Sequence, residues 1–286
     1  MIKIAFIGAG TVGTALAVLL SRQGYPLTAV YSRSRASAEK LASRVKGCKA
    51  VDSSQQATDA ADLTFITTPD SAIGSVASLV KWRPGQSTVH CSGADSTLIL
   101  EPARRQGAMV GGFHPLQTFA GVEQAIENIP GSTFTIEAEG SLFATLKEMA
   151  TALGGSCIPL QAGDKVAYHA AAVFACNYLV TLVKMATDLW QTFSIPPDQA
   201  TKALLPLIRG TLHNIETIGI PNCLTGPIAR GDAGTIDKHL KTLREKAPAL
   251  LFPYKELGLQ TIPIALAKGK IDAKKASELE VLLKAN

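Results

Sequence analysis

Three glycines near the amino terminus follow a short apolar run at a spacing that strongly restricts the local fold. Gly8, Gly10 and Gly13 form G-x-G-x-x-G directly after residues 4–7, and an Ala- and Leu-rich stretch follows at 14–20. This pattern predicts a buried parallel strand, a tight turn and a helix. The first glycine permits the turn, the second lets a pyrophosphate approach the backbone, and the third allows close helix packing. We therefore expect unpaired N–H groups at the helix N-terminus to bind the phosphates of a dinucleotide.

The segment after the second predicted strand, 27–31, indicates which dinucleotide is bound. An NAD-binding protein usually has an acidic residue here, but this chain reads Ser32-Arg33-Ser34-Arg35. Two guanidinium groups suit a 2′-phosphate, which predicts NADP. The alternative interpretation is that both arginines are only solvated cations of the loop. The predicted cofactor-binding residues are Gly8, Ala9, Gly10, Thr11, Val12, Gly13, Ser32, Arg33, Ser34, Arg35, Thr68 and Pro69.

Composition excludes several other classes of protein. A chain of 286 residues with 47% hydrophobic content predicts about two domains with a large core. The net charge of +5 is mild and aromatic residues are only 6%, which disfavours nucleic acid and fits an anionic cofactor or substrate. The five cysteines show no metal-ligand or disulfide spacing, so we expect no metal site and a cytoplasmic location. We also expect neither a signal peptide nor a membrane-spanning helix.

Apolar strands alternate with helical segments through the first part of the chain, which predicts a mainly parallel sheet. Ligands of such sheets bind beyond the carboxyl ends of the strands, where Thr68, Ser92 and His114 are expected to lie. The pattern becomes entirely helical after residue 162. We therefore predict an α/β N-terminal Rossmann-type domain over 1–162, followed by an all-α C-terminal domain over 163–286. The two domains are expected to pack closely, with a cleft between them.

Four further motifs carry a family resemblance. They are the segments His90–Ala94, Gly112–Phe119, Tyr168–Ala172 followed by Asn177, and Leu224–Asp232. Together they resemble the group that joins a Rossmann-like domain to domain of unknown function 2520. This group lies in the 6-phosphogluconate dehydrogenase-like superfamily, with pyrroline-5-carboxylate reductase and prephenate dehydrogenase. The resemblance implies an NADP-linked oxidoreductase whose helical domain, similar to the C-terminal domain of 6-phosphogluconate dehydrogenase, forms a homodimer.

Hydride transfer also needs a group that moves a proton, and the first candidates are Ser92 and His114. Their order and spacing are similar to those of prephenate dehydrogenase, where a Ser and a His-Pro flank the substrate hydroxyl. A histidine with a pKa near neutrality suits this role, with the serine orienting the oxygen. Alternatively, His114 only holds its loop in place.

Two other groups of residues compete for substrate contacts. Lys165 and His169 are spaced like the catalytic Lys and Asn of 3-hydroxyacid dehydrogenases, with His replacing Asn, and Asn177 follows two turns later. A buried His and Asn need hydrogen bonds, from a substrate or from helix packing. Thr225 and Arg230 lie in a loop that resembles the carboxylate-binding loop of pyrroline-5-carboxylate reductase, although Arg230 is alternatively structural.

These observations predict an NADP-dependent oxidoreductase that acts on a small anionic metabolite bound between the two domains. A non-catalytic protein that senses NADP(H), or a deazaflavin-dependent NADP reductase, remains the alternative. Which of His114, His169 or Lys165 moves the proton is left open, as is the identity of the substrate. The predicted catalytic residues are His114, His169 and Ser92, and the predicted substrate-binding residues are Gly93, Lys165, Asn177, Thr225 and Arg230.

Overall fold

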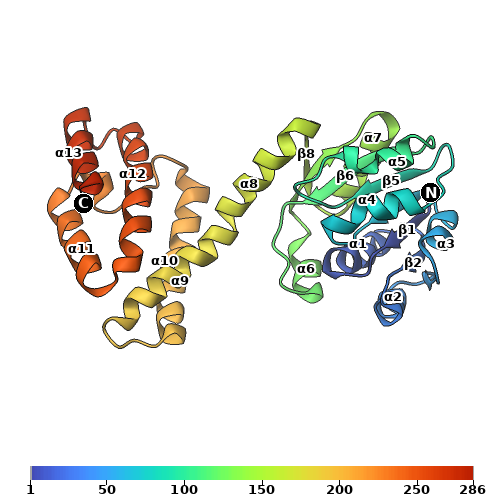
Figure 1. Ribbon diagram of the computed structural model, residues 1–286, viewed down its shortest axis with the longest axis horizontal. Helices are drawn as coiled ribbons and strands as arrows, with labels where there is room; N and C mark the ends of the chain where they lie inside the picture. Colours follow the sequence, from blue (N-terminus) through green and yellow to red (C-terminus); the bar gives the residue numbers. More distant parts are fainter. Residues whose placement is uncertain (1, 286) are drawn as a thin grey trace. The chain divides into compact units, whose positions relative to one another are not determined.

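The computed structural model describes residues 2–285, which divide into two compact units. The sheet unit ends at Cys176, and the helical unit begins at Asn177. Figure 1 draws the sheet unit in blue to yellow-green and the helical unit in yellow to red. The predicted α/β architecture followed by helices is confirmed.

The sheet unit contains eight strands in the order β3-β2-β1-β4-β5-β6-β7-β8. Neighbouring strands are parallel except for β6 and β7, so β7 and β8 run opposite to the other six. The strands are β1 (Ile4–Ile7), β2 (Leu27–Tyr31), β3 (Lys49–Ala50), β4 (Leu63–Ile66), β5 (Ser87–His90), β6 (Met109–Pro115), β7 (Thr133–Glu137) and β8 (Ser156–Pro159).

Helices cover both faces of this sheet, as the strand–helix alternation predicts. Helix α1 packs beside α6, while α4 packs against α5 and η1 (Figure 1). The helical elements of the sheet unit are α1 (Thr11–Arg22), α2 (Arg35–Ala42), α3 (Ser54–Asp59), α4 (Asp70–Leu79), η1 (Thr97–Leu100), α5 (Glu101–Arg104), α6 (Val122–Asn128), α7 (Gly140–Ala152), η2 (Ala162–Asp164) and α8 (Lys165–Ala175).

A row of four buried phenylalanines crosses one face of the sheet. Phe6 stacks on Phe65 at a centroid distance of 5.0 Å, and Phe113 stacks on Phe134 at 4.6 Å. Phe65 meets Phe113 edge-on at 6.0 Å. Slipping any of these strands by one residue would turn its phenylalanine to the opposite face, so this packing fixes the register. The carboxyl ends of β1, β4 and β5 lie level, because Ile7 pairs with Ile66 and Ile66 pairs with His90.

The domain boundary expected at residue 162 stays a prediction, but the division between the two compact units falls after Cys176, with α8 in the sheet unit. The physical reason is a set of side-chain bonds: Lys165 Nζ donates to the carbonyl of Ser92, and the Tyr168 hydroxyl bonds His114. The helical segment is interrupted at Cys176, which separates α8 from α9 (Asn177–Gln191).

The helical unit has its core among its last three long helices. Ile236 and Leu240 from α11 pack with Ile262 from α12 and with Leu279 and Leu283 from α13. Its elements are α9 (Asn177–Gln191), α10 (Pro197–Ile218), η3 (Ile228–Arg230), α11 (Ala233–Lys246), η4 (Pro248–Leu250), α12 (Leu251–Ala267) and α13 (Ala273–Lys284).

One helical stretch is long and apolar enough to be compared with a membrane span. The stretch Ala162–Gln191 has a mean hydropathy of 1.6 over its most apolar window, and it is long and apolar enough to cross a membrane by length and composition. A single helix of this kind is weak evidence for a membrane. Within the stretch, Lys165 is only 1% exposed and is hydrogen-bonded into the sheet unit.

Candidate active site

The glycine turn between β1 and α1 has the geometry that the motif predicts. Gly8 has φ +111°, and a Cβ on it would lie 2.6 Å from the Thr67 carbonyl carbon. A Cβ on Gly13 would collide with the Thr67 hydroxyl and lie 2.7 Å from the Gly8 carbonyl oxygen. Gly10, in contrast, has no heavy atom within 4 Å of its Cβ position. The first and third glycines therefore close the turn, and the second leaves open space over it.

The amino terminus of α1 is open to an anion. Its N-cap, Gly10, makes no side-chain cap, and the first turn contains no acidic residue. The initial N–H groups of a helix have no partner within the helix, and they carry a partial positive charge. Thr11, Val12 and Gly13 form this first turn, so they would contribute backbone N–H groups and not side chains.

A cavity of 380 Å³ opens directly over the glycine turn. Seven of the predicted cofactor-binding residues line it, and Ser54, Thr67 and Ser75 add hydroxyl groups that the sequence analysis did not assign. The cavity is lined by Ile7, Gly8, Ala9, Gly10, Tyr31, Ser32, Arg33, Ser54, Thr67, Thr68, Pro69, Ala72, Ser75, Val76 and Leu79.

Two predicted cofactor residues have other roles in the structure. Ser34 caps α2 by accepting a hydrogen bond from the Ser37 N–H. Arg35 donates to Glu39 at 2.8 Å and to Asp52 at 2.5 Å, and it does not line the cavity. An arginine held by two carboxylates is a poorer ligand for a phosphate. Arg33 is therefore the guanidinium that remains at the cavity.

A second polar cluster lies beyond the ends of β5 and β6. The rings of His114 and His169 are 6.5 Å apart, and a Cβ on Gly93 would lie 2.9 Å from His114 Nε2 and 2.7 Å from His169 Nδ1. Both imidazoles therefore converge on the bare backbone of Gly93. His169 Nδ1 is buried and has no hydrogen-bond partner among the described residues.

Tyr168 is a member of this cluster that the sequence analysis missed. Its hydroxyl lies 2.7 Å from His114 Nδ1, and the two rings meet edge-on. Burial raises the pKa of Tyr168, so the hydroxyl keeps its proton. Tyr168 lies in one of the four motifs and directly precedes His169, but nothing in the sequence indicates that α8 turns it toward β6.

Ser92 is fully engaged by its own loop and by Asp70 at the start of α4. Its hydroxyl accepts the N–H groups of Ala94 and Asp95, and it lies 2.9 Å from Asp70 Oδ2 and 3.1 Å from Asp95 Oδ2. The residue is 4% exposed. The structure therefore shows Ser92 shaping the loop after β5, and a catalytic role for it stays a prediction.

Lys165 is a buried cation beside the same loop. Its Nζ donates to the Ser92 carbonyl at 2.8 Å. Burial lowers its pKa, while the charges of Glu137, Asp95 and Asp70 act in the opposite direction. Lys165 also affects the nearby imidazole: burial, Lys165 and His169 together lower the pKa of His114 to about 4. The His114 ring is therefore neutral near pH 7.

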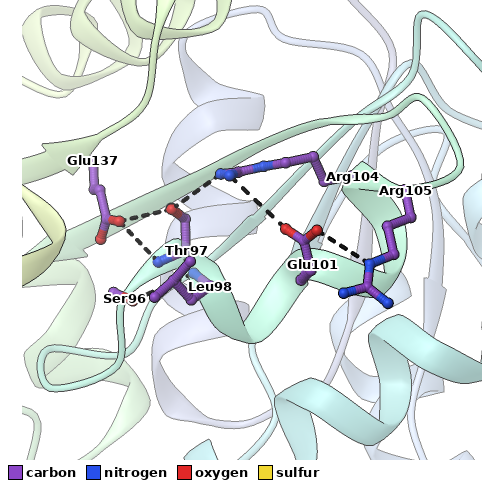
Figure 2. A network of polar contacts seen from close by, with 7 residues as sticks. All are labelled: Ser96, Thr97, Leu98, Glu101, Arg104, Arg105 and Glu137. Atoms are coloured by element: carbon purple, nitrogen blue, oxygen red, sulfur yellow. Dashed lines mark hydrogen bonds and ion pairs between the residues drawn. The ribbon is translucent and has the colours of Figure 1, made fainter.

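Glu137 on β7 anchors the segment that follows this loop. Its Oε1 accepts the Thr97 N–H at 3.0 Å and the Thr97 hydroxyl at 2.7 Å. Figure 2 shows the carboxylate facing Thr97, with Arg104 on the opposite side of that hydroxyl and paired with Glu101. These contacts tie η1 to the end of β7 and so stabilise the path of the loop that contains Ser92 and Gly93.

The remaining predicted substrate residues lie in the helical unit. Asn177 is the first residue of α9. Thr225 and Arg230 line a separate cavity of 440 Å³. The expected pairing of His169 with Asn177 falls across the division between the two units and stays a prediction.

The buried histidines should make the protein less stable in acid. Burial and Lys165 lower the pKa of His90 to about 3 from its ordinary value of 6.5, and His114 is lowered to about 4. Between the folded and unfolded pKa values, the unfolded chain binds more protons than the folded chain. The free energy of unfolding therefore falls as the pH drops from 6.5 to 4. Each tenfold difference in proton affinity between the folded and unfolded chain contributes about 1.4 kcal/mol. Urea unfolding at several pH values will measure this loss.

A matched pair of variants separates this effect from general acid sensitivity. His90 Nδ1 accepts the Ser92 N–H at 3.1 Å, and the side-chain oxygen of Asn keeps that acceptor in His90→Asn. This variant should flatten the pH dependence of stability. His213 is exposed, so His213→Asn should leave the dependence unchanged. If the stability of wild type and His90→Asn depended equally on pH, the assignment of this acid sensitivity to His90 would be contradicted.

The fold and site together define a Rossmann-type α/β domain followed by a helical region. Residues 1–115 match the Rossmann-like domain family, and residues 132–261 match the domain of unknown function DUF2520. The chain therefore combines these two domains, as its motifs predicted. Among curated proteins, none matches the sequence significantly.

Solved structures with the same fold cover nearly the whole chain. A Bacteroides fragilis protein provisionally named an NADP oxidoreductase is 27% identical, with a TM-score of 0.72 over 92% of this chain and 98% of that one. A Thermotoga maritima protein is 24% identical, with a TM-score of 0.73 over 93% and 99%. A reductive aminase from Aspergillus terreus, in complex with NADPH and ethyl levulinate, is 17% identical, with a TM-score of 0.67 over 98% and 99%.

Proposed function

We propose that the protein is an NADP-dependent oxidoreductase that transfers a hydride between the nicotinamide and a small anionic metabolite. The observation that carries this proposal is the presence, within one compact unit, of an open glycine-turn cavity and a buried cluster of polar side chains at neighbouring strand ends. The names of the Bacteroides fragilis protein and the Aspergillus terreus reductive aminase support it.

The residues around the cavity fit the cofactor. The α1 amino terminus, with open space over Gly10, suits the pyrophosphate. Ser32 and Arg33 line the same cavity, where no acidic residue is present to accept bonds from a ribose hydroxyl. A guanidinium with nearby hydroxyl groups favours a phosphorylated ribose, and hence NADP over NAD.

Arg33 should account for most of the preference for NADP. We expect Arg33→Ala to weaken NADPH binding about 10-fold or more, because it removes a charge-assisted contact to the 2′-phosphate, and to leave NADH binding unchanged. Arg35→Ala is the matched control, since it removes the same charge from a residue already paired with Glu39 and Asp52. Fluorescence titration measures both affinities. An equal loss of NADPH affinity in the two variants would contradict the assignment of the 2′-phosphate contact to Arg33.

The bound cofactor supplies or accepts the hydride, and the chain must supply the matching proton transfer. His114 is suited to this task because its neutral ring is held at Nδ1 by Tyr168. When Tyr168 donates to Nδ1, the hydrogen of the ring is on Nε2, which can donate to a substrate oxygen or nitrogen. In the other tautomer Nε2 accepts a proton from the substrate. His169 and Lys165 remain rival proton carriers.

Exposed apolar side chains in the helical unit support a homodimer. Apolar side chains on its first two helices are strongly exposed: Val180 on α9 is 69% exposed, and Leu207 and Ile218 on α10 are 67% and 54% exposed. Apolar surface of this extent favours burial against another chain. A second copy of this chain is the proposed partner, and a molar mass of twice 30.0 kDa in light scattering is the expected result.

The decisive experiment is to measure NADPH oxidation with keto acids, imines and aldehydes, alongside NADPH binding by fluorescence. Binding with turnover of at least one class supports the proposal. Binding without turnover by any of them favours a sensor of NADP(H), and turnover only with a deazaflavin favours a deazaflavin-dependent reductase. Absence of binding by any dinucleotide, oxidised or reduced, would overturn the proposal.

A further inference from the structure

The helical unit contains a cavity where three cationic side chains meet without a carboxylate. Its volume is 440 Å³, and it lies between the η3 segment and the end of α12. It is lined by Leu224, Thr225, Gly226, Ala229, Arg230, Lys268 and Lys270. None of these residues lines the cavity over the glycine turn.

Hydrogen bonds hold the wall of this cavity in place. Lys268 Nζ donates to the carbonyls of Asn222 and Leu224, each at 2.7 Å, and so joins the end of α12 to the loop before η3. Gly226 and Gly231, with φ of +97° and +67°, permit the turns that place Arg230 at the rim. The bonds of Lys268 therefore join the two segments, far apart in the sequence, that carry the cationic residues.

Among the residues that line this cavity, none carries a negative charge. Across residues 2–285, no ion pair is formed by Arg230, Lys268 or Lys270. The carboxylate of Asp232 caps α11 by accepting hydrogen bonds from the N–H and hydroxyl of Thr235. These bonds, and to a smaller extent the charge of Arg230, lower the pKa of Asp232. Like charges gathered in a concave surface repel each other, and a bound anion relieves that repulsion.

We propose that this cavity binds the phosphate group of a phosphate monoester. A phosphate offers close to two negative charges and three acceptor oxygens, which match one guanidinium, two ammonium groups and the Thr225 hydroxyl better than a carboxylate does. That the monoester is the substrate rests on the proposed function. The binding of phosphate itself does not depend on it.

The test is calorimetric titration of the full chain with inorganic phosphate, and with acetate as a singly charged comparison. The titration is run with and without saturating NADPH, because phosphate can also bind at the glycine turn. We expect saturable binding of phosphate that persists with NADPH and exceeds the binding of acetate. Arg230→Ala and Lys270→Ala should each weaken it about 5- to 10-fold.

Lys274→Ala is the matched control, because Lys274 is an exposed cation on α13 that does not line the cavity. It should leave phosphate binding unchanged. The proposal is overturned if phosphate does not bind saturably, if acetate binds equally well, or if Arg230→Ala and Lys270→Ala have no effect. If NADPH does not bind but phosphate binding still depends on Arg230 and Lys270, the proposed function fails and this site remains.

Discussion

His114→Ala should lower turnover about 10²- to 10⁴-fold while NADPH affinity stays unchanged. The variant removes the imidazole whose Nδ1 is 2.7 Å from the Tyr168 hydroxyl, and His114 does not line the cavity over the glycine turn. The loss should appear in kcat, because the ring acts on the proton and not on cofactor binding. Steady-state rates with the substrate class found by screening, together with NADPH titration, will measure both quantities.

Two companion variants identify how the histidine acts. Tyr168→Phe keeps the ring that meets His114 edge-on and removes only the hydroxyl, so it should cause a smaller loss of kcat and change the pH profile. Added imidazole should partly restore His114→Ala by occupying the vacated space. If His169→Ala abolishes turnover while His114→Ala retains it, the proton carrier is His169.

Gly13→Ala should weaken NADPH binding by about 100-fold or more and also destabilise the fold by roughly 1–3 kcal/mol. Its new methyl group would collide with the Thr67 hydroxyl and lie 2.7 Å from the Gly8 carbonyl oxygen. The turn between β1 and α1 would have to open, which would displace the N–H groups at the start of α1. NADPH titration and urea unfolding measure the two effects separately.

Gly10→Ala is the informative comparison for this variant. Gly10 has φ −79°, and its Cβ position meets no heavy atom within 4 Å, so the fold tolerates a methyl group there. Stability should therefore be unchanged, while NADPH affinity falls because the methyl occupies the space proposed for the pyrophosphate. If Gly10→Ala bound NADPH normally, the dinucleotide would not lie over this turn.

The parts of the fold that the sequence predicted are those determined by short-range patterns. The glycine spacing and the apolar run of β1 define the turn around Gly8 because their geometry depends on adjacent residues. The strand–helix alternation predicts a mainly parallel sheet, but it does not indicate that β7 pairs antiparallel with β6. Strand direction depends on the connecting segment and on the partner strand, and neither leaves a periodic signal.

The site residues that the sequence could not place depend on distant contacts. Arg35 is drawn away from the cavity by Asp52, 17 residues further along the chain. Lys165 and Tyr168 reach partners 73 and 54 residues away, which makes α8 part of the sheet unit. Composition and spacing carry no information about such pairs, so the sequence could not indicate that side chains of α8 gather near Gly93 and Ser92.

The attachment of α8 to the sheet unit has a consequence for modular exchange. The glycine turn, His114, Tyr168 and His169 all lie on one uninterrupted piece of chain that ends at Cys176. A chimera joined after Cys176 would inherit this whole set from one parent and the cavity of Arg230 from the other. Recombination at that point would let the proposed cofactor site and the proposed phosphate site vary independently of each other.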